Sequence, residues 1–222
     1  MGGYFNCVSY NCAFIGGGYH NNVAGTYGVI GGGYNHEICS GEGCSAILGG
    51  YCNIIDSDFS FIGGGCRNYV TMNCSVIVGG RDHTVSSRFS FIGGGCVNTI
   101  NSDCWGHAIV MGASSQICTT GHSNNFIGGG QANHIDCNTS NSTIGGGADN
   151  SICRASGADY GSTIAGGAHN RLLGSTCWGF IGGGSCNTGS APNVVVAGGR
   201  LNRAVGNCSA ILGGCFNSAC GS

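Results

Sequence analysis

The sequence lacks several residues on which many enzymes and nucleic-acid-binding proteins depend. Only seven basic and nine acidic residues occur among 222, the formal net charge is −2, and there is no lysine. A chain without lysine has neither a Walker-type phosphate loop nor Schiff-base chemistry. The arginines are scattered between Arg67 and Arg203, whereas a phosphate-binding protein needs a clustered basic face. We therefore expect no nucleic-acid partner.

Long apolar runs are also missing, and proline is scarce. No stretch approaches the roughly 20 apolar residues that span a bilayer, so we expect no membrane insertion. The residues after Met1 do not form the basic and apolar regions of a secretory signal. Glycine is abundant, with 47 residues, which disfavours helices, but one proline and no Gly-X-Y period exclude collagen.

A repeat of about 15 residues dominates the sequence instead. Each repeat is anchored by one Ile, or once by Val196, and has Gly three residues later in every case. Six of the twelve intervals between anchors are 15 residues, and the others are 17, 18 or 20. The isoleucines are predicted to fill the interior as a core column, consisting of Ile15, Ile30, Ile47, Ile62, Ile77, Ile92, Ile109, Ile127, Ile144, Ile164, Ile181 and Ile211.

An asparagine column follows the anchors at a distance of six residues. His36, His83 and Ser115 replace Asn in three repeats. We expect each side-chain amide to bond to the next in a ladder that also caps buried backbone groups. The column consists of Asn21, Asn53, Asn68, Asn98, Asn133, Asn150, Asn170, Asn187, Asn202 and Asn217.

This period, with two short apolar segments and a Gly-Gly corner, predicts one turn of a parallel β-solenoid. The expected fold is all-β, with about 14 turns of 15–20 residues. We expect a single domain over residues 1–222 without separate caps, and therefore head-to-tail stacking of copies. Extra residues fall between the second strand of a turn and the first strand of the next, which predicts variable loops along one edge.

The residue before each anchor is apolar in eleven of the thirteen repeats. Because neighbouring residues of a strand face opposite sides, this column points outward if the isoleucines point inward. A row of exposed phenylalanines predicts association with other copies, although loops folding back over it would be the alternative. We name the outer stripe after its phenylalanines, Phe14, Phe61, Phe91, Phe126 and Phe180.

Residues 60–70, Ser-Phe-Ile-Gly-Gly-Gly-Cys-Arg-Asn-Tyr-Val, and their copies resemble the head repeats of YadA-like trimeric autotransporter adhesins. They are also similar to the Ile-Gly-Gly-Gly-x-x-Asn repeats of fibre-like proteins of phages and large viruses. The resemblance covers essentially the whole chain. It implies a left-handed parallel β-roll assembled as a homotrimer and used as a surface fibre or adhesin.

Seventeen cysteines suggest an oxidised, cross-linked product. Because the number is odd, at least one thiol is free or bonded to another chain. No Cys-x-x-Cys occurs, so disulfides are a better interpretation than a zinc or iron–sulfur site. Placing the cysteines on the repeat suggests the pairs Cys52–Cys66, Cys137–Cys153, Cys104–Cys118, Cys39–Cys44 and Cys208–Cys220.

Other candidate chemistry is sparse. The recurring Gly-Gly-Gly lacks the Lys-Ser/Thr of a nucleotide loop, and Asp56 and Asp58 lack an obvious third catalytic group, although solenoids do host paired-carboxylate hydrolases. We therefore expect no enzyme, catalytic residue, cofactor or metal. Candidate N-glycosylation sites are Asn73, Asn138, Asn141 and Asn207, each of which begins an Asn-x-Ser/Thr triplet.

Two functions are compatible with this pattern. The first is a structural subunit of an extracellular, cell-surface or virion-surface fibre, reinforced by disulfides and assembled as a trimer and end to end. The alternative is an adhesin that binds a host glycan or receptor through the variable loops of residues 101–178. Trp105, Tyr160 and Trp178 are the residues there that stack well on sugar rings.

Overall fold

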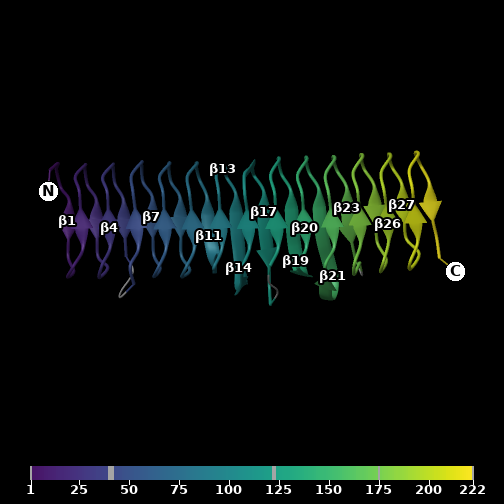
Figure 1. Ribbon diagram of the computed structural model, residues 1–222, viewed down its shortest axis with the longest axis horizontal. Helices are drawn as coiled ribbons and strands as arrows, with labels where there is room; N and C mark the ends of the chain where they lie inside the picture. The colour runs from purple at the N-terminus through teal and green to yellow at the C-terminus, as the bar shows by residue number, and fades with distance from the viewer. Residues whose placement is uncertain (1, 40–42, 122–123, 175, 222) are drawn as a thin grey trace. The chain divides into compact units, whose positions relative to one another are not determined.

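The computed structural model describes residues 2–39, 43–121, 124–174 and 176–221, while the side chains of Cys137 and of residues 154–159 lie outside the described part. Two compact units divide the chain, residues 1–100 and 101–222. In each unit the chain winds as a parallel β-solenoid, in which each turn contributes one strand to each of two sheets (Figure 1). The prediction of an all-β parallel solenoid is thus confirmed, and the described residues contain no helix.

Unit 1 stacks its odd-numbered and even-numbered strands in two separate parallel ladders. A short strand, β13 (Gly95–Cys96), lies at a corner, and β14 (Thr99–Trp105) crosses the boundary to unit 2. One ladder contains β1 (Cys7–Val8), β3 (Asn22–Val23), β5 (Glu37–Ile38), β7 (Ile54–Ile55), β9 (Tyr69–Val70) and β11 (Thr84–Arg88). The other contains β2 (Phe14–Ile15), β4 (Val29–Ile30), β6 (Ala46–Ile47), β8 (Phe61–Ile62), β10 (Val76–Ile77) and β12 (Phe91–Ile92).

Unit 2 repeats this arrangement, with β16 (Gly112–Ala113) at a corner. Its core-column ladder contains β15 (Ala108–Ile109), β18 (Phe126–Ile127), β20 (Thr143–Ile144), β22 (Thr163–Ile164), β24 (Phe180–Ile181), β26 (Val195–Val196) and β28 (Ala210–Ile211). The facing ladder contains β17 (Gln116–Thr119), β19 (His134–Ser140), β21 (Ser151–Tyr160), β23 (Arg171–Leu173), β25 (Thr188–Gly189), β27 (Arg203–Ala204) and β29 (Ser218–Ala219). Much of the inserted sequence thus extends strands β14, β19 and β21 rather than forming irregular loops.

The core lies between the two ladders and consists of two apolar columns. Every isoleucine of the core column is inaccessible to solvent, except Ile211, which is 7% exposed. The facing column, eight residues after each anchor, is equally buried from Val23 to Leu172. Adjacent turns pair in register, for example Ile62 with Ile77. Both columns therefore exclude water along each unit.

The asparagine column forms a ladder from side chain to backbone. The Nδ2 group of Asn170 donates hydrogen bonds to the carbonyl oxygens of Gly166 and Gly184, both at 3.0 Å. Its Oδ1 accepts the backbone N–H of Asn187 on the next turn, also at 3.0 Å. The sequence predicts amide-to-amide bonds, and one occurs, from Asn21 Nδ2 to Asn6 Oδ1 at 3.1 Å. The Asn170 amide instead bonds to three backbone groups, as buried backbone groups require.

A second polar column, two residues before the anchors, lines the opposite corner. Ser45 donates from Oγ to the carbonyl of Ser57 at 2.8 Å, and its Oγ accepts the backbone N–H of Ser60 at 3.1 Å. In unit 2, Asn125 does the same for Thr139 and Ser142, at 2.8 and 2.9 Å. The repeated serines were visible in the sequence, but their role depends on the side chains pointing inward.

Candidate functional site

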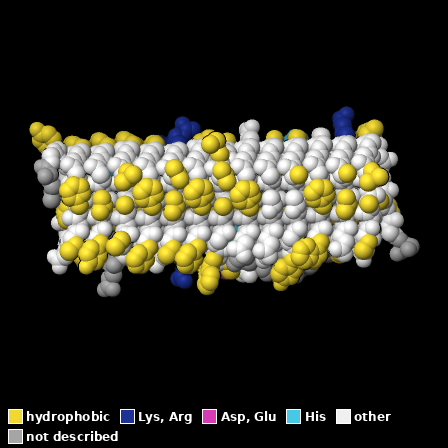
Figure 2. Space-filling model, in the orientation of Figure 1, with side chains coloured by type: hydrophobic (Ala, Val, Ile, Leu, Met, Phe, Trp, Pro, Cys, Tyr) yellow, Lys and Arg dark blue, Asp and Glu magenta, His cyan; other side chains and the backbone are white. Residues whose placement is uncertain are grey.

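The outer stripe lies on the outward face of the even-numbered strands of unit 1 and of the matching ladder of unit 2. Figure 2 shows it as a row of hydrophobic side chains along the middle of the visible face. Four of its phenylalanines are between 37% and 56% exposed, and Phe61 is half-buried. Within the described part of the chain, therefore, no loop folds back to bury the four exposed rings.

Residue size along the outer stripe is compensated within each turn. Where the stripe carries Phe, the residue two positions later is Gly, and the ring lies over it: a Cβ added to Gly16 or Gly63 would meet the Phe Cε1 at 3.4 or 3.3 Å. Where the stripe carries Ala46, the second position is Leu48. In these turns a large side chain at one outward position is matched by a small residue at the other, whereas Thr143 and Gly145 form a turn without a large residue at either position. Matched side chains of this kind suit close packing against another surface.

A column of tyrosines lines the corner of the first turns of unit 1. Tyr19, Tyr34 and Tyr51 stack with ring centroids 5.2 and 5.1 Å apart and nearly parallel planes. Tyr4 pairs in register with Tyr19, but Cys66 takes the position after Tyr51. Sequence reasoning missed this column, although the spacing of 15, 15 and 17 residues was a visible signal.

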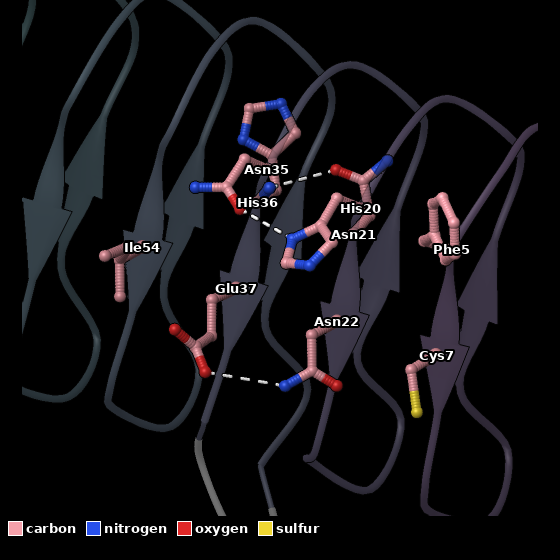
Figure 3. A pocket seen from close by; sticks show the side chains of 9 residues that line it. All are labelled: Phe5, Cys7, His20, Asn21, Asn22, Asn35, His36, Glu37 and Ile54. Carbon is pink, nitrogen blue, oxygen red and sulfur yellow. Dashed lines mark hydrogen bonds between the residues drawn. The ribbon is translucent and has the colours of Figure 1, made fainter.

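Beside the tyrosines, a shallow hollow of about 250 Å³ opens on the outward face of β1, β3, β5 and β7 (Figure 3). His20 Nδ1 lies 2.8 Å from Asn35 Oδ1, and Asn22 Nδ2 donates to Glu37 Oε1 at 3.4 Å. These polar groups are already paired across adjacent turns. The polar groups of the hollow therefore join neighbouring turns to one another, and they do not form a converging set of catalytic groups.

The cysteines of the candidate disulfides lie on several different columns. Six of the ten, namely Cys39, Cys44, Cys52, Cys66, Cys208 and Cys220, carry free thiols in this structure. Cys104, Cys118 and Cys153 are half-buried, and the side chain of Cys137 lies outside the described part. The pairings stay predictions. Burial, followed by the charges of Glu37 and Asp56, raises the pKa of the Cys39 thiol to about 11.

The remaining candidate residues are dispersed. Asn141 and Asn207 are exposed, while Asn73 and Asn138 are half-buried. The Oδ1 atom of Asn73 accepts the backbone N–H of Asp58 at 3.1 Å. Within the described ranges, no group of three or more His, Cys, Asp and Glu side chains is placed to hold a metal ion. Nor does that part of the chain contain a helix long and apolar enough to cross a bilayer.

Two histidines of the asparagine column, His36 and His83, are buried in unit 1. Each Nδ1 accepts the backbone N–H of the next residue in the column, Asn53 or Asn98, at 3.1 Å. Burial is the largest cause that lowers the pKa of both imidazoles. In unit 2, burial lowers the pKa of His107 to about 4. All three rings are therefore held neutral at pH 7.

Acidification is expected to destabilise the fold because of these histidines. Their folded-state pKa values lie below the ordinary value of about 6.5, so the unfolded chain binds more protons and stability falls as the pH falls. The loss begins below about pH 6.5 and continues to about pH 4, where His107 titrates. Burial raises the pKa of Asp136, so this carboxyl group makes the folded chain more stable as the pH falls.

Urea denaturation followed by circular dichroism between pH 7.5 and 4 measures this effect. His36→Asn restores the residue typical of the column and removes one titrating group, so its denaturation midpoint should depend less on pH than that of the wild type. An unchanged pH dependence in this variant would contradict the assignment.

Comparison with protein-family models and with curated proteins finds no match to this chain. Its function must therefore be argued from its own surfaces. Of those surfaces, the outer stripe is present in each unit and is apolar at eleven of its thirteen positions.

Proposed function

We propose that this chain is a structural protein, the β-solenoid subunit of an extracellular or virion-surface fibre, and that copies associate laterally as a trimer through the outer stripe. The exposed phenylalanines and their compensating glycines carry the proposal. An exposed apolar stripe in each unit favours association, because water contact with each ring is unfavourable. Buried polar ladders at both corners give the stiffness that a fibre requires. End-to-end stacking stays a prediction.

The substitution Phe91→Glu is expected to shift the protein from trimer to monomer in light scattering under reducing conditions. A carboxylate at the centre of an apolar interface would lose hydration without gaining a partner. Tyr69→Glu is the matched control, since Tyr69 and Phe91 are 38% and 37% exposed but lie on opposite sheets. The control should remain trimeric. A wild-type protein that is monomeric at every concentration would contradict lateral assembly.

A glycan-binding adhesin is the second candidate. Trp105, Tyr160 and Trp178 are exposed, and the backbone N–H of Trp178 donates to the carbonyl of Tyr160 at 3.1 Å, which places two of these aromatic residues on adjacent turns. An open hollow of about 540 Å³ lies on the outward side of β17, β19 and β21, lined by Cys118, Thr120, Asp136, Asn138 and Cys153. Sugar binding on a glycan array that depends on Trp178 would favour this function over a purely structural one.

A further inference from the structure

A second row of side chains, distinct from the outer stripe, runs along one edge of unit 1. Its members stand three residues before each core isoleucine, and sulfur alternates with aromatic rings. The edge lies where the chain passes from the odd-numbered to the even-numbered strands (lower edge in Figure 1). We call it the edge row, and it consists of Cys12, Tyr27, Cys44, Phe59, Cys74 and Phe89.

The backbone holds the edge row in register from turn to turn. The N–H of Cys74 donates to the carbonyl of Asp58 at 3.0 Å, and the N–H of Phe89 donates to the carbonyl of Asn73 at 3.2 Å. One turn earlier, the N–H of Gly43 donates to the Asp58 carboxylate at 3.0 Å. Adjacent positions of the row are therefore separated by one turn, about 4.8 Å.

The aromatic members of the row occupy costly positions. Tyr27, Phe59 and Phe89 have φ angles of 59°, 55° and 52°, in the left-handed region that large side chains rarely adopt. All three side chains are more than half exposed. Glycine or asparagine would adopt this backbone more easily, and Gly106 and Asn124 stand at the same position in unit 2. Rings kept at such positions indicate a surface used for contact.

The thiols of the edge row cannot pair with one another within the chain. Phe59 separates Cys44 from Cys74, and Tyr27 separates Cys12 from Cys44, so consecutive thiols lie two turns, or about 9.6 Å, apart. A disulfide needs Cα atoms within about 7 Å. Cys12 and Cys44 are exposed and Cys74 is half-buried, so a disulfide bond of these thiols requires a partner outside this row.

We infer that the edge row is a covalent contact between two copies of this chain. A partner that engages all three thiols must present sulfur at the same two-turn spacing, and a second copy of the row does so. A two-fold axis through Cys44 maps the row onto itself, so that Cys12 faces the partner's Cys74, Cys44 faces the partner's Cys44, and Tyr27 faces the partner's Phe59. This contact goes beyond the proposed trimer, because it uses a different surface.

Cross-linking follows ordinary thiol–disulfide exchange. A Cys44 thiolate attacks oxidised glutathione, which forms a mixed disulfide and releases one reduced glutathione. The partner's Cys44 thiolate then displaces the second glutathione and completes the S–S bond between the chains. Each bridge thus converts two thiols and one oxidised glutathione into one disulfide and two reduced glutathiones. Cys39, with a thiol pKa of about 11, competes poorly because little of it is thiolate.

Oxidation of the full chain with glutathione disulfide, followed by non-reducing electrophoresis and peptide mass spectrometry, tests the contact. The expected result is a covalent dimer that contains a Cys44–Cys44 bridge, which can form only between chains. The double variant Cys12→Ser/Cys44→Ser removes one member of every bridge in the row and should reduce the yield of dimer at least several-fold, whereas Cys52→Ser, on a different column of the same unit, should not.

Two results would overturn the inference: an intrachain Cys39–Cys44 bridge as the main product, or covalent dimers whose peptides contain no edge-row cysteine. The test is separable from that of the proposed function. Lateral assembly through the outer stripe is measured in reducing buffer and depends on Phe91, whereas the edge-row contact is measured after oxidation and depends on Cys12, Cys44 and Cys74.

Discussion

Alanine in place of Gly147 is expected to lower the free energy of unfolding by about 3–5 kcal/mol. Gly147 has a φ of 92° at a corner of unit 2, and an added Cβ would run into the carbonyl oxygen of Gly167 on the next turn. That oxygen already accepts the backbone N–H of Ala148 at 2.9 Å, so it cannot move away without breaking this hydrogen bond between the two turns. The Cβ would also meet the Asn150 Nδ2 group at 2.7 Å, and this group is itself held by hydrogen bonds to the carbonyls of Gly146 and Gly167.

The neighbouring glycine provides a matched control. A Cβ on Gly146 would have its nearest contact, the carbonyl oxygen of Gly129, at 3.9 Å, which is an ordinary van der Waals separation. Gly146→Ala should therefore be neutral or slightly stabilising, since alanine restricts the unfolded chain. Urea denaturation followed by circular dichroism compares the two variants. Equal midpoints would show that the corner is more tolerant than its geometry indicates.

The substitution Asn170→Ala is expected to cost about 3–6 kcal/mol. It removes the acceptor of the Asn187 backbone N–H and the donor to the carbonyls of Gly166 and Gly184. The Asn187 N–H and the Gly166 carbonyl are then buried without this partner, at roughly 1–3 kcal/mol apiece when water cannot enter. The Gly184 carbonyl keeps the backbone N–H of Ala168 and loses a second hydrogen bond, at about 1 kcal/mol. The same urea titration measures the loss.

Arg171→Ala is the control for the asparagine ladder, because Arg171 is the next residue and points outward into solvent. Its free energy of unfolding should stay within about 0.5 kcal/mol of the wild type. Should Asn170→Ala also stay within this range, the amide would be dispensable and water would have replaced its bonds.

The fold was largely predictable because the residues that build it have one physical role each. Ile62 and its equivalents can only be interior, and Asn68 recurs where a corner leaves backbone groups to satisfy. The left-handed positions were not predictable, since Val97 and Phe59 are among the residues least suited to a positive φ. Tertiary stacking imposes that conformation, and no local preference in the sequence signals it.

The candidate surfaces were only partly predictable. Alternation along the strands correctly places Phe91 outside, but the compensation between Phe61 and Gly63 requires knowing that the ring bends over the next outward position. The alternation of Cys44 and Phe59 becomes meaningful only when the turns are aligned, because insertions of different length obscure it in the sequence.

The pairing of large and small residues along the outer stripe has a consequence for how the protein can change. Since Phe14 is matched by Gly16 within one turn, duplication or deletion of an entire turn copies or removes both members together. Such a change lengthens or shortens the array and keeps the pairing of a large residue with a glycine. A single replacement at either position instead leaves a protruding side chain or an unfilled space on the outer stripe. We therefore expect the number of repeats to vary more freely among natural variants than the residue types at these two positions.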